Sequence, residues 1–258
     1  MKSIYKKIDI SYSFIFVIFL SLISGLFKDV IMLFLVIIIH ETGHIFTSLI
    51  FKWKISKISI GIVGGYITYD DVIDKPYKEE ILIAMSGFLF QVMFLLIAYI
   101  LYSNNLVDDK FMFLVKKYNL ALIIFNILPI YPLDGSKILN IIFNMFLPYK
   151  KSLKLTSIVS FIFILLMLYF FIFLSIKFEL SYIMILMFLV EKLITFSNEI
   201  PYLFNKFLFE RYINPIKTNK YCIIKDDNLS KFKRQKKHIF ILKNKQYTEK
   251  NILSKRFD

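Results

Sequence analysis

Cysteine and histidine are scarce in this chain. Of its 258 residues, one is cysteine and three are histidine. The single Cys222 excludes both an intrachain disulfide framework and a zinc site built from cysteines. Acidic residues are also few, 19 against 33 Lys and Arg. The net charge of +14 is concentrated in the predicted loops and the C-terminal tail, where membrane topology would place it, so nucleic acid is not an expected partner.

Apolar residues dominate the rest of the sequence. Hydrophobic residues make up 57% of the chain and the mean hydropathy is +0.63, whereas soluble domains are ~45–50% apolar. The composition predicts an all-α polytopic membrane protein with about six transmembrane helices. We expect a transmembrane domain over residues 1–204 and a basic cytosolic tail over residues 205–258. The expected spans are residues 10–26, 30–51, 81–102, 118–131, 155–176 and 180–196.

The charges of the loops predict the orientation in the membrane. Residues 10–26 follow a lysine-containing start but lack an A-x-A cleavage site, so we expect an uncleaved first span. With the amino terminus inside, most of the 33 Lys and Arg residues fall on the cytosolic side. This bias supports an even number of spans and two cytosolic termini.

A metal-binding spacing interrupts the second span. Residues 40–44 read His-Glu-Thr-Gly-His, and a random shuffle of this composition would give His-Glu-x-x-His with a probability on the order of 1 in 1000. On a helix, His40 and His44 share a face and can offer two imidazoles to one ion. Glu41 projects about 100° away, within reach of a water molecule at the metal. The alternative is a pair of core histidines, which is disfavoured because ionisable groups at membrane depth are costly.

The segment between the second and third spans has the pattern of extended structure. β-Branched residues at positions 55, 58, 60, 62 and 63 are interrupted by glycines, and Tyr66–Tyr69 follows. We expect a small β-hairpin near the active site, with an edge that could pair with an extended substrate segment. An ordinary connecting loop is the alternative.

A second polar motif ends the fourth span. Pro129 and Pro132 break the helix, and Asp134-Gly135 follows. Zinc held by two histidines still needs a protein ligand, and a carboxylate is the commonest third one at hydrolytic sites, so Asp134 is the expected ligand. The alternative is that Asp134 only caps the next helix.

The tail is basic, with 15 Lys and Arg against five Asp and Glu over residues 205–258. His238–Leu242 could form a short strand. Nothing beside His238 resembles a set of metal ligands.

The two motifs, at their separation, resemble those of the site-2 protease family of intramembrane zinc metalloproteases over roughly residues 30–140. The resemblance implies that His40, His44 and Asp134 bind Zn²⁺ and that Glu41 is the catalytic base. It also implies that Asn126, with Pro132 in the Pro-x-x-Pro-Leu-Asp-Gly run, helps to position substrate. The resemblance implies a related Asn at the position where this chain has Gln91.

The compact layout looks like the sporulation branch of that family, which processes pro-sigma-K. The resemblance implies a membrane-tethered pro-sigma factor as substrate, inhibitory membrane partners, and a location in the membrane that surrounds the forespore. A homo-oligomer is a further expectation. The tail is similar to a shortened CBS domain. The alternative is a catalytically idle scaffold or metal transporter, which would need the metal ligands but have little use for Glu41.

Overall fold

The structure is a computed structural model that describes residues 8–10, 25, 27–61, 64–69, 75–173, 180–216, 218–242 and 245–257. It divides into two compact units. The first unit comprises Met1–Val72 and Lys78–Ile127, and the second comprises Ile73–Tyr77 and Leu128–Asp258. The expected boundary between residues 204 and 205 falls inside a helix, Leu180–Ile213, which continues past Pro201. The division into a membrane domain and a tail remains a prediction.

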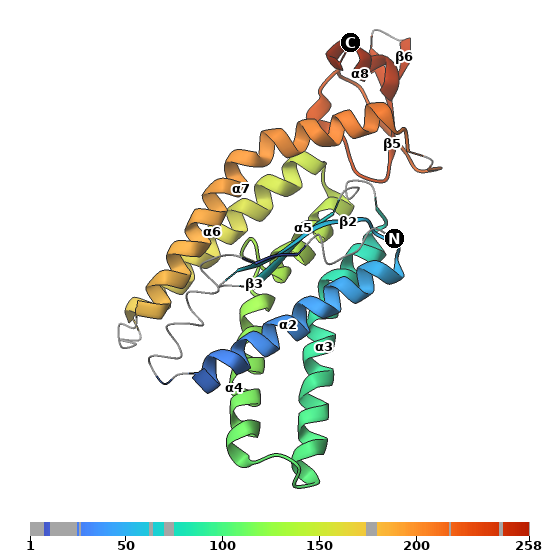
Figure 1. Cartoon of the computed structure of the whole chain (residues 1–258). Coiled ribbons are helices and arrows are strands. Elements are labelled where there is room, and N and C mark those ends of the chain that lie inside the picture. Colours follow the sequence, from blue (N-terminus) through green and yellow to red (C-terminus); the bar gives the residue numbers. More distant parts are fainter. Residues whose placement is uncertain are drawn as a thin grey trace. The chain divides into compact units, whose positions relative to one another are not determined.

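Three helices form the first unit (Figure 1). They are α2 (Phe27–Ile50), α3 (Tyr77–Ser103) and α4 (Asp109–Ile127), and a short connection joins α3 to α4. The helices share an apolar core in which side chains from all three meet. We expected the fourth span to begin at residue 118, but α4 begins at Asp109, because residues 109–117 between the expected third and fourth spans are also helical. The core side chains are Met32, Val36, Ala98, Met112 and Val115.

A three-stranded sheet accompanies these helices. Its strands are β1 (Ile8–Ile10), β2 (Ile55–Gly61) and β3 (Gly64–Tyr69), in the order β1-β2-β3. The antiparallel pairing of β2 with β3 confirms the expected hairpin and rules out a plain loop. The Tyr69 hydroxyl lies 2.8 Å from the Ser48 hydroxyl of α2, and its ring packs edge-on against Trp53. The hairpin is therefore anchored to the helix that carries the metal motif.

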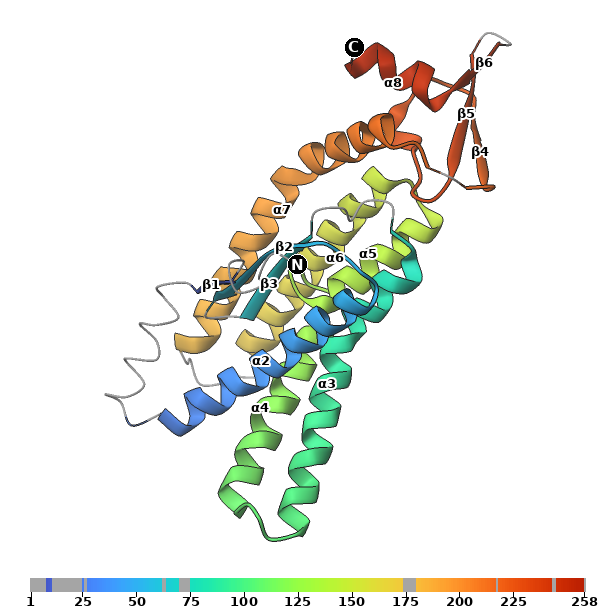
Figure 2. The same ribbon diagram turned by 45° about the vertical axis from the view of Figure 1, so that its right-hand side comes forward.

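Helices α5 (Asp134–Phe146), α6 (Tyr149–Phe173) and α7 (Leu180–Ile213) begin the second unit. α6 and α7 run side by side (Figure 2), and the hydroxyls of Ser157 and Ser197 lie 2.7 Å apart between them. α6 begins six residues before the expected fifth span. The lysines at 150, 151 and 154, which precede the expected fifth span, lie in the first turns of α6 because the helix starts immediately after Pro148.

The tail folds into a second small sheet (Figure 2). Its strands are β4 (Tyr221–Ile224), β5 (Lys237–Leu242) and β6 (Lys245–Thr248), and the helix α8 (Glu249–Phe257) follows. A short 3₁₀ turn, η2 (Leu229–Lys231), lies between β4 and β5. β5 pairs in parallel with β4 and antiparallel with β6. The strand expected at residues 238–242 is confirmed.

Three of the described helices are long and apolar enough to cross a membrane: α2, α3 and α6. They correspond to the expected second, third and fifth spans. Among the described residues, α4 and α7 do not meet this description: α4 carries four charged residues in its first half, and α7 carries charged residues from Glu191 onward. Ile10 of the expected first span lies in β1, and the rest of that span, apart from Gly25, is outside the described residues. The number of six spans remains a prediction.

Candidate metal centre

The two motif histidines of α2 face each other inside the first unit. His40 is 4% exposed and His44 is 5% exposed. Their rings meet edge-on with centroids 4.7 Å apart, and the two Nε2 atoms are separated by 3.1 Å. The four-residue spacing therefore places both imidazoles at one point.

Each histidine uses its other ring nitrogen for a hydrogen bond. His40 Nδ1 lies 3.0 Å from Gln91 Oε1, and His44 Nδ1 lies 2.6 Å from the carbonyl oxygen of Ile83. Because both of these oxygens only accept, the proton of each ring belongs on Nδ1. The lone pairs of both Nε2 atoms are thereby directed toward one position.

This donor set fits a zinc ion. Two nitrogen ligands at Zn–N distances of ~2.0–2.1 Å in tetrahedral geometry lie about 3.3 Å apart, close to the observed 3.1 Å. Two lone pairs that face each other at this distance repel unless a cation lies between them. Acceptors at Nδ1 are the usual supports of a zinc-binding histidine.

Glycines allow α3 to approach the histidines. A Cβ atom at Gly87 would lie 2.5 Å from His40 Cε1 and 2.7 Å from His44 Nε2. A Cβ atom at Gly43 would lie 2.5 Å from the Ser86 carbonyl oxygen. The small residues Ser86 and Gly87 thus let α3 pack against the metal-binding face of α2.

The remaining expected site residues of the first unit are Glu41 and Asn126. Glu41 is partly exposed on α2, next to His40. Asn126 is partly buried near the end of α4, one residue before the helix ends at Ile127. Both positions are consistent with the expected roles, which remain predictions.

Asp134 is the first residue of α5 in the second unit and is 7% exposed. The N-cap residue of this helix is Leu133, and its side chain makes no capping hydrogen bond. Asp134 therefore follows the cap position, and its expected role as a metal ligand stays a prediction. Its Oδ1 accepts a hydrogen bond of 2.8 Å from Lys137 Nζ, one turn further along.

The proline-containing loop before Asp134 is fixed by α6. The backbone N–H of Tyr131 donates to Ser160 Oγ at 3.0 Å, and Ser160 Oγ in turn lies 3.2 Å from the carbonyl oxygen of Pro129. The ring of Tyr131 stacks on Phe196 of α7 with centroids 4.2 Å apart. Pro132 follows in the same loop. These contacts hold the start of α5, and with it the Asp134 side chain.

Two polar residues near the histidines had no role assigned to them from the sequence. Gln91 and Asn119 are both 0% exposed, and Gln91 supports His40 directly. The signal that could have identified Gln91 is an uncharged polar residue inside an apolar helix, one turn after Gly87. Asn119 was harder to recognise from the sequence, because α4 carries several polar residues in its first half and one more does not stand out.

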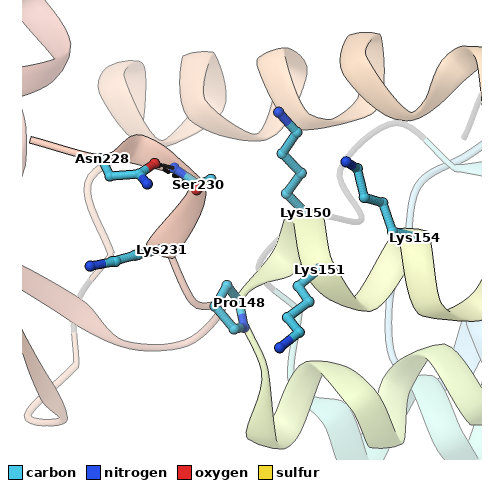
Figure 3. A pocket seen from close by; sticks show the side chains of 7 residues that line it. All are labelled: Pro148, Lys150, Lys151, Lys154, Asn228, Ser230 and Lys231. Atoms are coloured by element: carbon cyan, nitrogen blue, oxygen red, sulfur yellow. Dashed lines mark hydrogen bonds between the residues drawn. The ribbon is translucent and has the colours of Figure 1, made fainter.

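A basic pocket lies in the second unit (Figure 3). Its volume is about 370 Å³, and four of its seven lining residues are lysines. The lining holds no carboxylate or imidazole, so the pocket does not have the ligands of a zinc site. Lys231 donates a hydrogen bond to Asp226, which holds the pKa of that carboxyl below its usual range. The lining residues are Pro148, Lys150, Lys151, Lys154, Asn228, Ser230 and Lys231.

A buried His-x-x-x-His pair with supported Nδ1 atoms, on a helix apolar enough to span a membrane, defines a candidate metal site of a membrane protein. A model of peptidase family M50 matches residues 29–108 and 104–170, which together are more than half of the chain. The chain belongs to this family, the site-2 proteases, and its metal is zinc.

Individual relatives agree with this assignment. The chain is 31% identical over 193 residues to stage IV sporulation protein FB of Bacillus subtilis, a match that covers 75% of this chain and 67% of that protein. It is 28% identical over 131 residues to a zinc metalloprotease of Methanocaldococcus jannaschii, covering 49% of this chain and 38% of that one. The solved structure of the site-2 protease from M. jannaschii matches with a TM-score of 0.57 and 27% identity, over 74% of this chain and 90% of that one.

Proposed function

We propose that this chain is an intramembrane zinc endopeptidase in which His40, His44 and Asp134 hold one zinc ion. The observation that carries the proposal is the 3.1 Å separation of two Nε2 atoms whose Nδ1 partners are already in place. A carboxylate commonly completes such a pair at hydrolytic sites. Asp134 is buried and lies directly after the N-cap residue of its helix, so its carboxylate is the one we assign.

Each site residue has a separate role in the proposed reaction. When bound, zinc lowers the pKa of water and polarises a carbonyl group. The Glu41 carboxylate accepts the proton of the water that attacks the scissile carbonyl carbon, and then delivers it to the nitrogen of the leaving amine. The C–N bond breaks, giving one new carboxylate and one new amine. Gln91 and Ile83 keep the two imidazoles oriented through their Nδ1 atoms.

The substrate segment is proposed to bind in an extended form. A transmembrane helix shields its carbonyl groups in its own hydrogen bonds, so it must unwind before hydrolysis. β3 is the last strand of the described sheet, in the order β1-β2-β3, and its outer edge offers replacement main-chain hydrogen bonds. Asn126 and Pro132 are assigned to the positioning of this segment.

The substrate is proposed to be a membrane-tethered pro-sigma factor of the pro-sigma-K kind, cut during sporulation. Support comes from the similarity to stage IV sporulation protein FB and from the apolar helices, which suit a substrate in or next to the bilayer. The same proposal places the chain as a multi-pass protein of the membrane around the forespore, with both termini cytosolic. Inhibitory membrane proteins and a homo-oligomer are further parts of it.

A cleavage assay with matched variants tests this proposal. Pro-sigma-K is co-expressed with the wild type, Glu41→Gln or Asn126→Ala, and the processed product and the zinc content of each purified variant are measured. We expect Glu41→Gln to keep zinc and to lose cleavage, because the base is gone but the ligands remain. Asn126→Ala should keep zinc and cleave more slowly, with a raised KM.

Two outcomes would contradict the proposal. Cleavage retained in Glu41→Gln would show that Glu41 is not the base. Zinc bound by a wild type that cuts no membrane-tethered substrate would favour the idle scaffold or transporter.

A further inference from the structure

A buried chain of three polar side chains leads from the metal-binding face of α2 through α3 to α4. Its members are His40, Gln91 and Asn119, and the two amides are each 0% exposed. All three lie in the first unit. Buried amides in an apolar helical environment are costly unless their groups are paired, and here each pairing has a defined direction.

The direction of these hydrogen bonds is set by the main-chain carbonyl group of Gln91, which can only accept. The Nδ2 of Asn119 donates a 2.9 Å hydrogen bond to the main-chain oxygen of Gln91. A main-chain carbonyl oxygen only accepts, so the NH₂ of Asn119 must face it. The Oδ1 of Asn119 is thereby turned toward the side chain of Gln91.

The orientation of the Gln91 side-chain amide follows in the same way. Its Nε2 donates a 3.1 Å hydrogen bond to Asn119 Oδ1, which leaves Gln91 Oε1 directed at His40 Nδ1, 3.0 Å away. If the amide of Gln91 were reversed, its Oε1 would face Asn119 Oδ1, which is also an acceptor, and its NH₂ would face His40 Nδ1 as a donor. His40 would then carry its proton on Nε2, where it blocks metal binding.

We infer that Asn119 is a positioning residue for the metal centre: it acts through Gln91 to keep the proton of His40 on Nδ1 and the Nε2 lone pair available to zinc. The inference rests on the proposed zinc site and adds to it a residue on α4 that touches neither the metal nor the substrate. His44 does not depend on this relay, since its Nδ1 binds the main-chain oxygen of Ile83.

Zinc affinity is the readout, measured on the full-length protein in detergent by competition with a chromophoric chelator. Loss of an outer partner of a metal-binding histidine weakens metal affinity by about 10–100-fold. We expect a loss of this size in Gln91→Met, which keeps the length but removes the acceptor, and a loss at the lower end in Asn119→Leu and Asn119→Ala. Gln91→Glu keeps an acceptor for His40 Nδ1 and should retain zinc.

A double variant of Gln91 and Asn119 distinguishes an effect of Asn119 that acts through Gln91 from a general effect on the fold. If Asn119 acts only through Gln91, Gln91→Met with Asn119→Leu should bind zinc as Gln91→Met alone does. The Co²⁺-loaded proteins give a second readout, because their visible absorption reports ligand geometry. Asn144→Leu is the control: it removes an amide of similar burial, 2% exposed, from α5, and should leave zinc affinity unchanged.

Three results would overturn the inference. Wild-type affinity in Asn119→Leu and Asn119→Ala would show that the relay has no effect, although the proposed zinc site would stand. A further loss caused by Asn119→Leu in the Gln91→Met background would show a merely structural role. Absence of zinc from folded wild type would overturn the proposed function and the inference together.

Discussion

Gly87 lies so close to the two histidines that any side chain at this position would clash with them. A Cβ atom there would approach His40 Nδ1 and His44 Nε2 to 2.7 Å each. One of these atoms donates to Gln91 and the other is a proposed zinc ligand. At the residue scale, the geometry of the metal centre thus depends on the absence of a side chain as much as on the ligands.

Gly87→Ala should therefore lower the zinc content sharply. The added methyl group must push at least one imidazole aside, and overpacking of this kind costs about 1–3 kcal/mol of stability. Zinc per chain and thermal unfolding are the measurements. Ala98→Gly, elsewhere on α3, is the control, since it should destabilise the helix by about 1 kcal/mol without loss of zinc. Full zinc occupancy in Gly87→Ala would contradict the close packing of α3 on α2.

The sequence identified the candidate ligands more readily than the residues that support them. His40, His44 and Asp134 are chemically distinctive residues in apolar surroundings, so spacing and membrane cost identified them as candidates. Gln91 was recognisable as a polar residue in a span, but its partner could not be read from spacing. The pairing of Gln91 with Asn119 depends on how α3 and α4 pack, which is a tertiary property.

At the scale of elements, a buried ion pair links α8 to the end of α7. Arg211 of α7 is 2% exposed, and its Nη1 lies 3.6 Å from Oε2 of Glu249 in α8. The other oxygen of Glu249 accepts hydrogen bonds of 2.6 Å from the backbone N–H and from Nδ1 of His238 in β5. His238 Nε2 accepts from the backbone N–H of Lys233 at 2.9 Å. One carboxylate thus connects α7, β5 and α8.

Glu249→Leu should loosen the tail while the zinc site remains intact. Removing one partner of a buried ion pair leaves the other charge unpaired and costs about 3–5 kcal/mol. Hydrogen exchange of the β5 amides should become much faster, with zinc content unchanged. Asp226→Asn is the control, because the Asp226–Lys231 pair is exposed and such surface pairs contribute little to stability. Unchanged exchange in Glu249→Leu would show that other contacts hold the tail.

Elements were predicted well where the pattern was periodic and poorly at their ends. The hairpin of β2 and β3 and the strand β5 followed from β-branched residues and glycines. The start of α6 was misplaced because lysines at a helix start look like a loop when read as charge alone. α4 was likewise extended by residues whose polarity suggested a link, since helix formation does not require apolar residues along the whole length.

At the scale of the whole molecule, the central claim is that two distant motifs form one metal centre. His40 and His44 belong to the first unit and Asp134 belongs to the second. The two motifs are separated by nearly a hundred residues in the sequence. We predicted that the fold brings them together because zinc held by two histidines needs a third protein ligand. Composition alone gave the membrane class, and the apolar helices α2, α3 and α6 agree with it.

Zinc per chain in the detergent-purified protein tests that claim most directly, with the wild type compared with Asp134→Ala. The account predicts about one zinc ion in the wild type and a clear loss in Asp134→Ala, because two imidazoles alone hold the ion weakly. Asp109→Ala, which removes an exposed carboxylate at the start of α4, should keep full occupancy. Full zinc occupancy in a folded Asp134→Ala protein, or none in folded wild type, would contradict the account.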